Sequence, residues 1–153
     1  MTRTFAALLA LSFAAPAFAE SHASMGDAEA GEKTFAKCKS CHMIVSDDGE
    51  EIQKGGRTGP NLYGVIGRTA GAVDDYRYGD DLVAAGEAGL VWDEETLASY
   101  VADPRGYLRE YLDDSSARSK MSFKLRDGSE DVAAYLASVS PAAEESDETE
   151  KTD

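Results

Sequence analysis

The chain has 153 residues, enough for one domain, and carries 29 acidic against 15 basic side chains for a net charge of −14. This excess of acid argues against nucleic acid as a partner, because binding to phosphates needs clustered positive charge. Helix-forming residues are plentiful and runs of β-branched residues are scarce, so we expect a mainly helical fold.

The first 19 residues are predicted to be a signal peptide. Arg3 precedes an apolar stretch from Phe5 to Ala15, and Ala17-Phe18-Ala19 forms an A-x-A cleavage site. A membrane anchor is the alternative, but the apolar stretch is too short for a transmembrane helix and polar residues follow it at once. We therefore expect cleavage after Ala19 and export to the periplasm without membrane insertion. The mature net charge would be −15, because Arg3 is the one charged residue removed.

The mature chain is predicted to begin with a mobile segment and a helix. Residues 20–26 are small and polar, and Asp27 is suited to cap a helix over residues 28–37. Residues 43–60 are expected to form a loop, since Asp47-Asp48-Gly49 is a turn signal.

Further helices are predicted after this loop. Residues 61–91 are expected to be irregular, apart from a short helix near residues 80–85. Asp93 is suited to be the N-cap of the next helix. Pro104 ends that helix and favours the start of another one through Tyr111.

The chain closes with a helix and an acidic tail. The helix is expected from about Ser129 to Ser138, and Pro141 follows it. Residues 142–153 hold six acids and one lysine and predict a disordered, solvated tail. The boundaries are then a domain over residues 27–140 and a tail over residues 141–153. No strand pair is expected, and such long loops in so small a domain indicate that the chain wraps around something.

One motif carries the chemistry. Cys38-Lys39-Ser40-Cys41-His42 has the C-x-x-C-H spacing that is the attachment signature of c-type haem. Two residues between the thiols let the backbone span the porphyrin edge that bears the two vinyl groups. The histidine directly after the second cysteine then lies under the iron, where its neutral imidazole can be a ligand.

Three other interpretations of the motif are weaker. A thioredoxin-like pair of cysteines would need a βαβ context, which the sequence lacks. A zinc site would need a fourth ligand, and the second histidine of the chain, His22, falls in the predicted mobile segment. A structural disulfide between Cys38 and Cys41 suits an exported protein but gives His42 no role.

A sixth ligand of the iron can be sought by elimination. Methionine sulfur, a second histidine or an open position are the options. The four methionines are Met1, Met25, Met43 and Met121. The first two lie in the signal peptide and the mobile start, and the third adjoins His42 and cannot reach the opposite face of the haem. Met121 therefore remains the candidate, with an ordinary core methionine as the alternative.

The order of further residues resembles the class I c-type cytochromes over residues 27–140. The matching residues are Gly31, Phe35, Thr58–Gly64, Gly67, Arg68, Trp92–Leu97, Tyr100, Asp103, Pro104, Lys120–Phe123 and Asp131–Leu136. The resemblance implies that the first and last helices cross at Gly31, Phe35, Val132 and Tyr135. Residues 44–57 and 106–118 are longer than in the mitochondrial form. These insertions resemble the bacterial cytochrome c2 and c-550 branch of the family.

The resemblance implies an all-α class I cytochrome c fold, with four to five helices and long loops wrapped around one covalent haem c. It implies a periplasmic mono-haem electron carrier with His42 and Met121 as axial iron ligands, and not an enzyme. The implied partners are membrane-bound and periplasmic redox proteins of a respiratory chain: a quinol–cytochrome c reductase, a terminal oxidase, a photosynthetic reaction centre or denitrification reductases. A monomer is expected.

The resemblance also implies roles around the haem. Pro60 would accept a hydrogen bond from the axial histidine, and the Tyr100 hydroxyl would approach the methionine sulfur. The residues implied to bond or neutralise the haem propionates are Arg68, Tyr78, Trp92 and Ser119. Leu82 departs from the pattern, because many members have asparagine there. The residues implied to surround the exposed haem edge and dock partners are Lys37, Lys39, Arg105, Lys120 and Lys124.

Two other functions compete with electron transfer. A sensing or ligand-binding haem protein would have a vacant or displaceable sixth position. A haem peroxidase would normally need a second haem or an open face with acid–base residues, whereas the chain has one C-x-x-C-H and no spare histidine.

Overall fold

The computed structural model describes residues 25–141. The predicted signal peptide over residues 1–19, most of the predicted mobile segment and nearly all of the acidic tail lie outside the described residues. Those predictions stay predictions.

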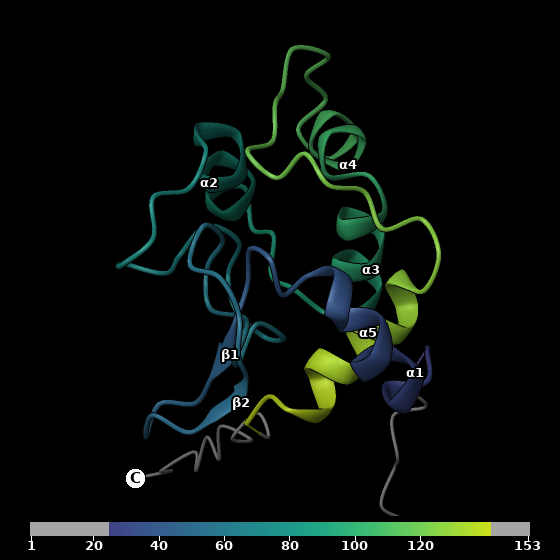
Figure 1. Ribbon diagram of the computed structural model, residues 1–153. Helices are drawn as coiled ribbons and strands as arrows, with labels where there is room; N and C mark the ends of the chain where they lie inside the picture. The colour runs from purple at the N-terminus through teal and green to yellow at the C-terminus, as the bar shows by residue number, and fades with distance from the viewer. Residues whose placement is uncertain (1–24, 142–153) are drawn as a thin grey trace, which may run out of the picture.

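The described chain is mainly helical, as expected (Figure 1). Its elements in order are α1 (Ala28–Thr34), the 3-10 helix η1 (Phe35–Lys37), β1 (Ile44–Val45), β2 (Glu51–Gln53), α2 (Asp80–Glu87), α3 (Glu94–Ala102), α4 (Pro104–Tyr111) and α5 (Ser129–Ser138). The helix expected over residues 28–37 is present as α1 continued by η1. The short helix near residues 80–85 is confirmed and runs on to Glu87.

Three aspartates cap the starts of helices, and Asp27 and Asp93 do so as predicted. The Asp27 carboxylate accepts from the first-turn amides of α1, and Asp93 forms a capping box with Thr96 at α3. Asp103 accepts from the Gly106 amide and precedes Pro104, the first residue of α4. Because a helix leaves its first amides without internal partners, these local bonds fix where α1, α3 and α4 start.

The expectation that the chain has no strand pair is wrong. β1 and β2 form a short antiparallel pair inside the segment expected to be a loop, and the turn between them contains Gly49 at φ 89°. The pair is tied to the helices, since the Gln53 side chain donates to the Tyr135 hydroxyl of α5 at 2.9 Å. Ile44 is fully buried, so tertiary contacts rather than sequence periodicity define this pair.

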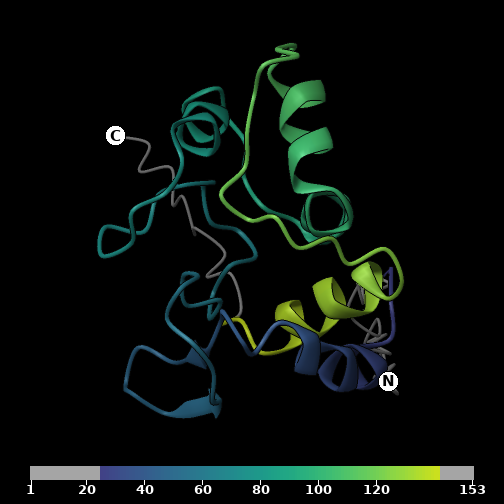
Figure 2. The ribbon, with the colours of Figure 1, turned by 45° about the horizontal axis from the view of Figure 1, so that its top comes forward.

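The crossing of α1 and α5 is the main helix contact (Figures 1 and 2). A Cβ built on Gly31 would lie 1.9 Å from the Asp131 carbonyl oxygen, so only glycine allows this approach. The rings of Phe35 and Tyr135 fill the crossing, with centroids 5.8 Å apart. The crossing inferred from Gly31, Phe35, Val132 and Tyr135 is confirmed.

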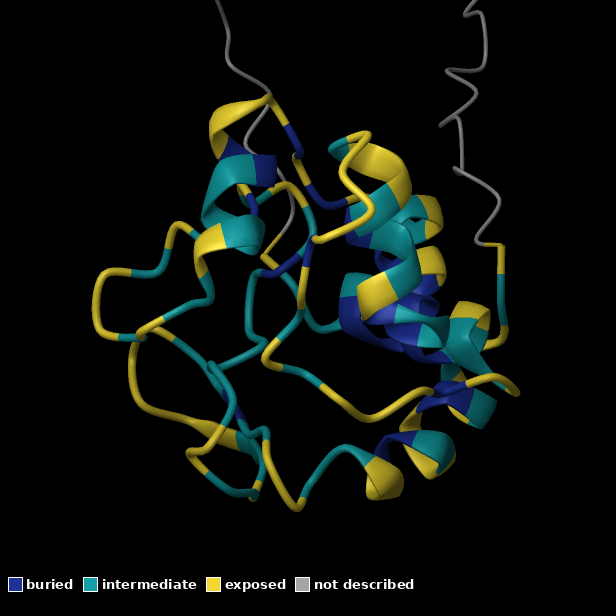
Figure 3. Ribbon diagram, turned by 90° about the horizontal axis from the view of Figure 1, so that it is seen from above, coloured by how far each residue is buried: buried dark blue, intermediate teal, exposed yellow. Residues whose placement is uncertain are grey.

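Burial divides the molecule into two parts (Figure 3). Buried residues concentrate where α3 and α5 pack, whereas the long loops are mostly half-buried or exposed. In the part of the chain that the structure describes, no helix is long and apolar enough to cross a membrane.

Candidate functional site

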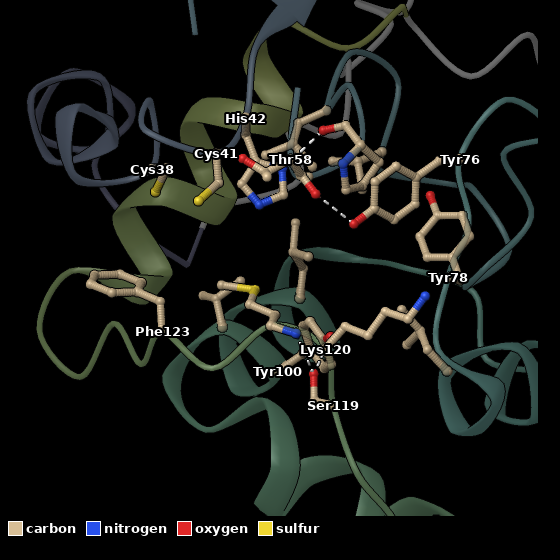
Figure 4. Close-up of a pocket in the computed structure, with 18 of the residues that line it drawn as sticks. Cys38, Cys41, His42, Thr58, Tyr76, Tyr78, Tyr100, Ser119, Lys120 and Phe123 are labelled. Carbon is tan, nitrogen blue, oxygen red and sulfur yellow. Dashed lines mark hydrogen bonds between the residues drawn. The ribbon is translucent and has the colours of Figure 1, made fainter. Parts of the chain in front are cut away.

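The loops and helices enclose a cavity of about 620 Å³ (Figure 4). Its walls come from the C-x-x-C-H segment, residues 58–82, α3 and residues 118–125. All ten residues predicted to bind the cofactor or its iron line it: Cys38, Cys41, His42, Pro60, Arg68, Tyr78, Trp92, Tyr100, Ser119 and Met121. The fold thus brings together side chains from four separate stretches of sequence.

The two cysteines lie in a tight turn that continues η1. The amides of Cys41 and His42 both donate to the Cys38 carbonyl oxygen, at 3.1 and 2.9 Å. The two thiols are not joined to each other in a disulfide. Burial raises the pKa of the Cys38 thiol to about 11. An unmodified Cys38 is therefore protonated at neutral pH, which slows its oxidation because the thiolate is the reactive form.

His42 is held in one tautomer. Its Nδ1 donates to the Pro60 carbonyl oxygen at 2.9 Å, because a carbonyl can only accept. Burial lowers the pKa of His42, although the bond to Pro60 acts in the opposite direction. The ring is thus neutral near pH 7, and its Nε2 carries a lone pair suited to a metal. Gly59 makes room for the ring, since a Cβ there would lie 2.3 Å from Cε1 of His42.

Residues 118–125 form the wall opposite His42, where Ser119 and Lys120 are seen in Figure 4. The Met121 amide donates to Ser119 Oγ at 3.2 Å, and Ser119 Oγ lies 3.1 Å from the Tyr100 hydroxyl. Burial raises the pKa of Tyr100, so this phenol stays neutral. Tyr100, expected to approach the methionine sulfur, thus also fixes the backbone that carries Met121.

Arg68 and Tyr78 bring polar groups to the cavity wall. Arg68 donates to the carbonyl oxygens of Asn61, Tyr63 and Gly64, and these bonds stabilise the loop over residues 61–64. Burial raises the pKa of Tyr78, against the opposing effect of Arg68, so its hydroxyl remains a donor at neutral pH. A positive charge beside a neutral phenol suits an anionic group such as a propionate. That role stays a prediction.

Tyr76 was missed by the sequence reasoning. Its ring lies edge-on to Tyr78, with centroids 4.7 Å apart, and its hydroxyl donates to the Thr58 carbonyl oxygen at 2.8 Å. Figure 4 shows this bond between Thr58 and Tyr76, both of which line the cavity. No local pattern indicated Tyr76, because its hydrogen-bond partner lies 18 positions away in the sequence.

Trp92 packs against Tyr100 with ring centroids 5.0 Å apart, and against Tyr107 at 6.3 Å. Trp92 is buried. The ring contacts account for a packing role, and the predicted propionate contact of Trp92 stays a prediction.

The five predicted docking residues differ in their surroundings. Lys37 and Lys120 line the cavity, whereas Lys39, Arg105 and Lys124 do not. Lys124 forms an ion pair of 2.7 Å with Asp103, and Lys120 Nζ donates to the Arg77 carbonyl oxygen at 2.8 Å. Sequence reasoning did not single out Phe123, which lines the cavity and is 45% exposed.

The cavity fits a large, flat, mostly apolar group. Its volume lies within the usual range of cofactor pockets, and its apolar walls present one neutral imidazole and one thioether. The two thiols lie beside that imidazole (Figure 4). Among residues 25–141, no three or more His, Cys, Asp or Glu side chains gather as a metal site. This donor set fits an iron already held by a porphyrin better than a bare ion.

The chain is similar to curated proteins over most of its length. It is 71% identical over 141 residues to cytochrome c-551 of Roseobacter denitrificans, covering 92% of this chain and 97% of that protein. It is 57% identical to cytochrome c2 of Rhodobacter capsulatus, covering 89% of this chain and 95% of that one. No family model matches the chain.

Solved structures agree with these relatives. The crystal structure of cytochrome c2 from Rhodobacter capsulatus has a TM-score of 0.73 and 59% identity, covering 74% of this chain and 98% of that one. Ferric cytochrome c-550 from Paracoccus versutus has a TM-score of 0.74 and 50% identity, covering 76% and 99%.

Proposed function

The chain belongs to the class I c-type cytochromes of the cytochrome c2 and c-550 type and carries one covalent haem c, and on that premise we propose that it is a periplasmic single-electron carrier with His42 and Met121 as axial ligands. Cys38 and Cys41 supply the two thioethers. The protein turns over no substrate and passes electrons between redox proteins as a monomer.

The observation that carries the ligand assignment is the state of His42. Its Nδ1–H is committed to Pro60, so the neutral ring offers Nε2 to the cavity. The Met121 segment forms the wall opposite, and Ser119 holds its backbone in place. Neutral imidazole and thioether are a recognised axial pair of cytochromes c.

The bound haem supplies one-electron chemistry by cycling between Fe(III) and Fe(II). The residues of this chain keep water away from it through apolar walls, which include the buried Val65, Leu97 and Leu136. A dry pocket and methionine ligation disfavour the extra positive charge of the oxidised state, so they raise the reduction potential. Arg68, Tyr78, Trp92 and Ser119 are the proposed partners of the propionates.

The rival functions make a different prediction about the sixth position. A sensor or a peroxidase needs it open, and the oxidised protein would then have a high-spin visible spectrum. The proposed ligation predicts a low-spin spectrum with a weak sulfur-to-iron band near its red end. The methionine in the cavity wall favours the second outcome.

Covalent attachment can be tested by solvent extraction. Acid-acetone should leave the haem on the protein, because thioethers to Cys38 and Cys41 survive conditions that dissociate axial ligands. The measurement is the haem absorbance in the solvent against that in the precipitate, with a non-covalent haem protein as control. Haem recovered mainly in the solvent would rule out c-type attachment.

Docking to partners is proposed to occur at the cavity edge, through Lys37, Lys39, Arg105, Lys120 and Lys124. The mature net charge of −15 would repel an acidic partner at long range. The screening length is only about 8 Å at physiological ionic strength, so local charge dominates near contact. Rim charges of this kind act mainly on the association rate.

The salt dependence of electron transfer tests this docking. With an acidic-faced oxidase or reductase, the second-order rate should fall as salt rises. Lys39→Glu should slow transfer roughly fivefold at low salt, because it changes two charges at the rim. Lys151→Glu, in the predicted tail, is the matched control with a small effect. Stopped-flow rates that climb steadily with salt, with both variants equal, would contradict docking by these lysines.

A further inference from the structure

Residues 118–125, which carry Met121, are tied to the rest of the fold from two sides. On one side α3 holds them: Ser119 Oγ lies 3.1 Å from the Tyr100 hydroxyl, and the Leu125 amide donates to the Val101 carbonyl oxygen at 2.8 Å. These contacts hold the segment at Ser119 and at Leu125. Its first residue, Arg118, is held from the other side.

The entry is held by α2 and the chain before it. The Arg118 amide donates to Oδ2 of Asp81 at 2.8 Å, and Lys120 Nζ donates to the Arg77 carbonyl oxygen at 2.8 Å. The first bond joins residues 37 positions apart and has a carboxylate acceptor. Amide bonds to an ionised carboxylate are stronger than bonds to neutral acceptors.

Asp81 itself sits on a well-anchored element. It is half-buried in the first turn of α2, where an acidic side chain is favourable. Further along α2, a Cβ on Gly86 would lie 2.0 Å from the Ala70 carbonyl oxygen, so the helix packs directly on backbone. Leu82, the next residue after Asp81, lines the cavity. The bond to Asp81 therefore fixes the position of the Arg118 backbone relative to the cavity wall.

We propose that Asp81 is a positioning residue for the sixth ligand: its carboxylate fixes the Arg118 amide and so holds Met121, three residues later, against the haem. The inference rests on the proposed ligation by Met121. When the Arg118 bond is lost, the segment keeps its α3 contacts and the Lys120–Arg77 bond but loses the carboxylate acceptor at its start. Met121 then yields more readily to an external ligand.

Neighbouring variants give a matched test. Asp81→Ala removes the acceptor, and Asp81→Asn keeps an oxygen acceptor without the charge. Asp80→Ala is the control, because Asp80 is an exposed acid in the same first turn of α2. Among the hydrogen bonds of the described residues, none joins Asp80 to residues 118–125.

Two measurements on the holoproteins decide the question. Hydrogen exchange by NMR should show the Arg118 amide protected in the parent protein and in Asp80→Ala, and exchanging at least tenfold faster in Asp81→Ala. Imidazole titrated into the oxidised proteins should bind roughly fivefold tighter to Asp81→Ala than to the parent. This is a difference of about 1 kcal/mol in binding free energy, since a tenfold change in affinity corresponds to about 1.4 kcal/mol. Asp81→Asn should lie between Asp81→Ala and the parent, as partial rescue.

The outcomes separate this inference from the proposed function. If the parent shows the sulfur-to-iron band and Met121→Ala lacks it, the ligation stands and Asp81 alone is tested. Equal imidazole affinities for Asp81→Ala and Asp80→Ala would then overturn the inference, even if Asp81→Ala unfolds at a lower denaturant concentration. If the parent itself lacks the band, the ligation fails and the inference falls with it.

Discussion

Replacing Met121 with alanine is expected to lower the reduction potential of the holoprotein by on the order of 0.2 V, a fraction of the roughly 0.8 V range that axial ligands set. The thioether is a soft ligand that favours the reduced iron, and alanine offers no donor in its place. The sulfur-to-iron band should vanish, and the opened position should bind imidazole or cyanide. Voltammetry and the visible spectrum of the oxidised protein measure these changes.

Met25→Ala is the control for this variant. Met25 is 52% exposed and does not line the cavity, so its loss should leave the potential and the spectrum unchanged. If Met121→Ala also kept the parent potential and band, another group would be the sixth ligand. The sensor interpretation would then regain support.

Removing both anchoring thiols should have the largest effect on folding. The Cys38→Ala, Cys41→Ala double variant, prepared without haem, is expected to be largely unfolded. Without the haem, the mostly apolar walls of a cavity of about 620 Å³ would be exposed to water, which is unfavourable. A typical domain has a stability of only about 5–15 kcal/mol, so a small domain cannot easily lose the apolar contacts that the haem would make. The cofactor therefore supplies folding free energy as a bound ligand does.

Circular dichroism and thermal unfolding measure this outcome. Ser40→Ala is the matched control, because it changes one of the two residues between the thiols and leaves the attachment possible. It should mature with haem and unfold cooperatively. A haem-free double variant with native-like helix content and a cooperative transition would show that residues 25–141 form a sufficient core alone.

Much of this protein can be predicted from local sequence. The Cys38-Lys39-Ser40-Cys41-His42 spacing specifies the cofactor, since attachment depends on residues within one turn of chain. The helix starts at Asp27 and Asp93 follow from capping, and the start of α4 follows from Pro104, which are equally local signals. Gly31 and Tyr135 indicated the crossing of the first and last helices, through their match to the family. In each case the determining groups are near neighbours or part of a known pattern.

The strand pair of β1 and β2 could not be predicted from local sequence. β1 and β2 have two and three residues, too few for an alternating pattern to be recognised. What stabilises them is distant: Ile44 is buried in the core, and Gln53 donates to Tyr135, 82 positions away. Tyr76 was missed for the same reason, because its partner is the Thr58 carbonyl oxygen across a loop.

The sequence by itself determined the kind of cofactor and the starts of helices α1 and α3, because C-x-x-C-H attachment and helix capping act within a few residues. Only the tertiary structure decided which distant groups hold the cavity walls in place. The bond from His42 to the Pro60 carbonyl oxygen was implied by the family resemblance, whereas nothing in the sequence indicated that Asp81 binds the Arg118 amide from 37 positions away. A backbone carbonyl or amide has the same chemistry at every residue, so no residue type marks which one will be used. The choice is made when the loops close around the cavity and each buried polar group has to find a partner.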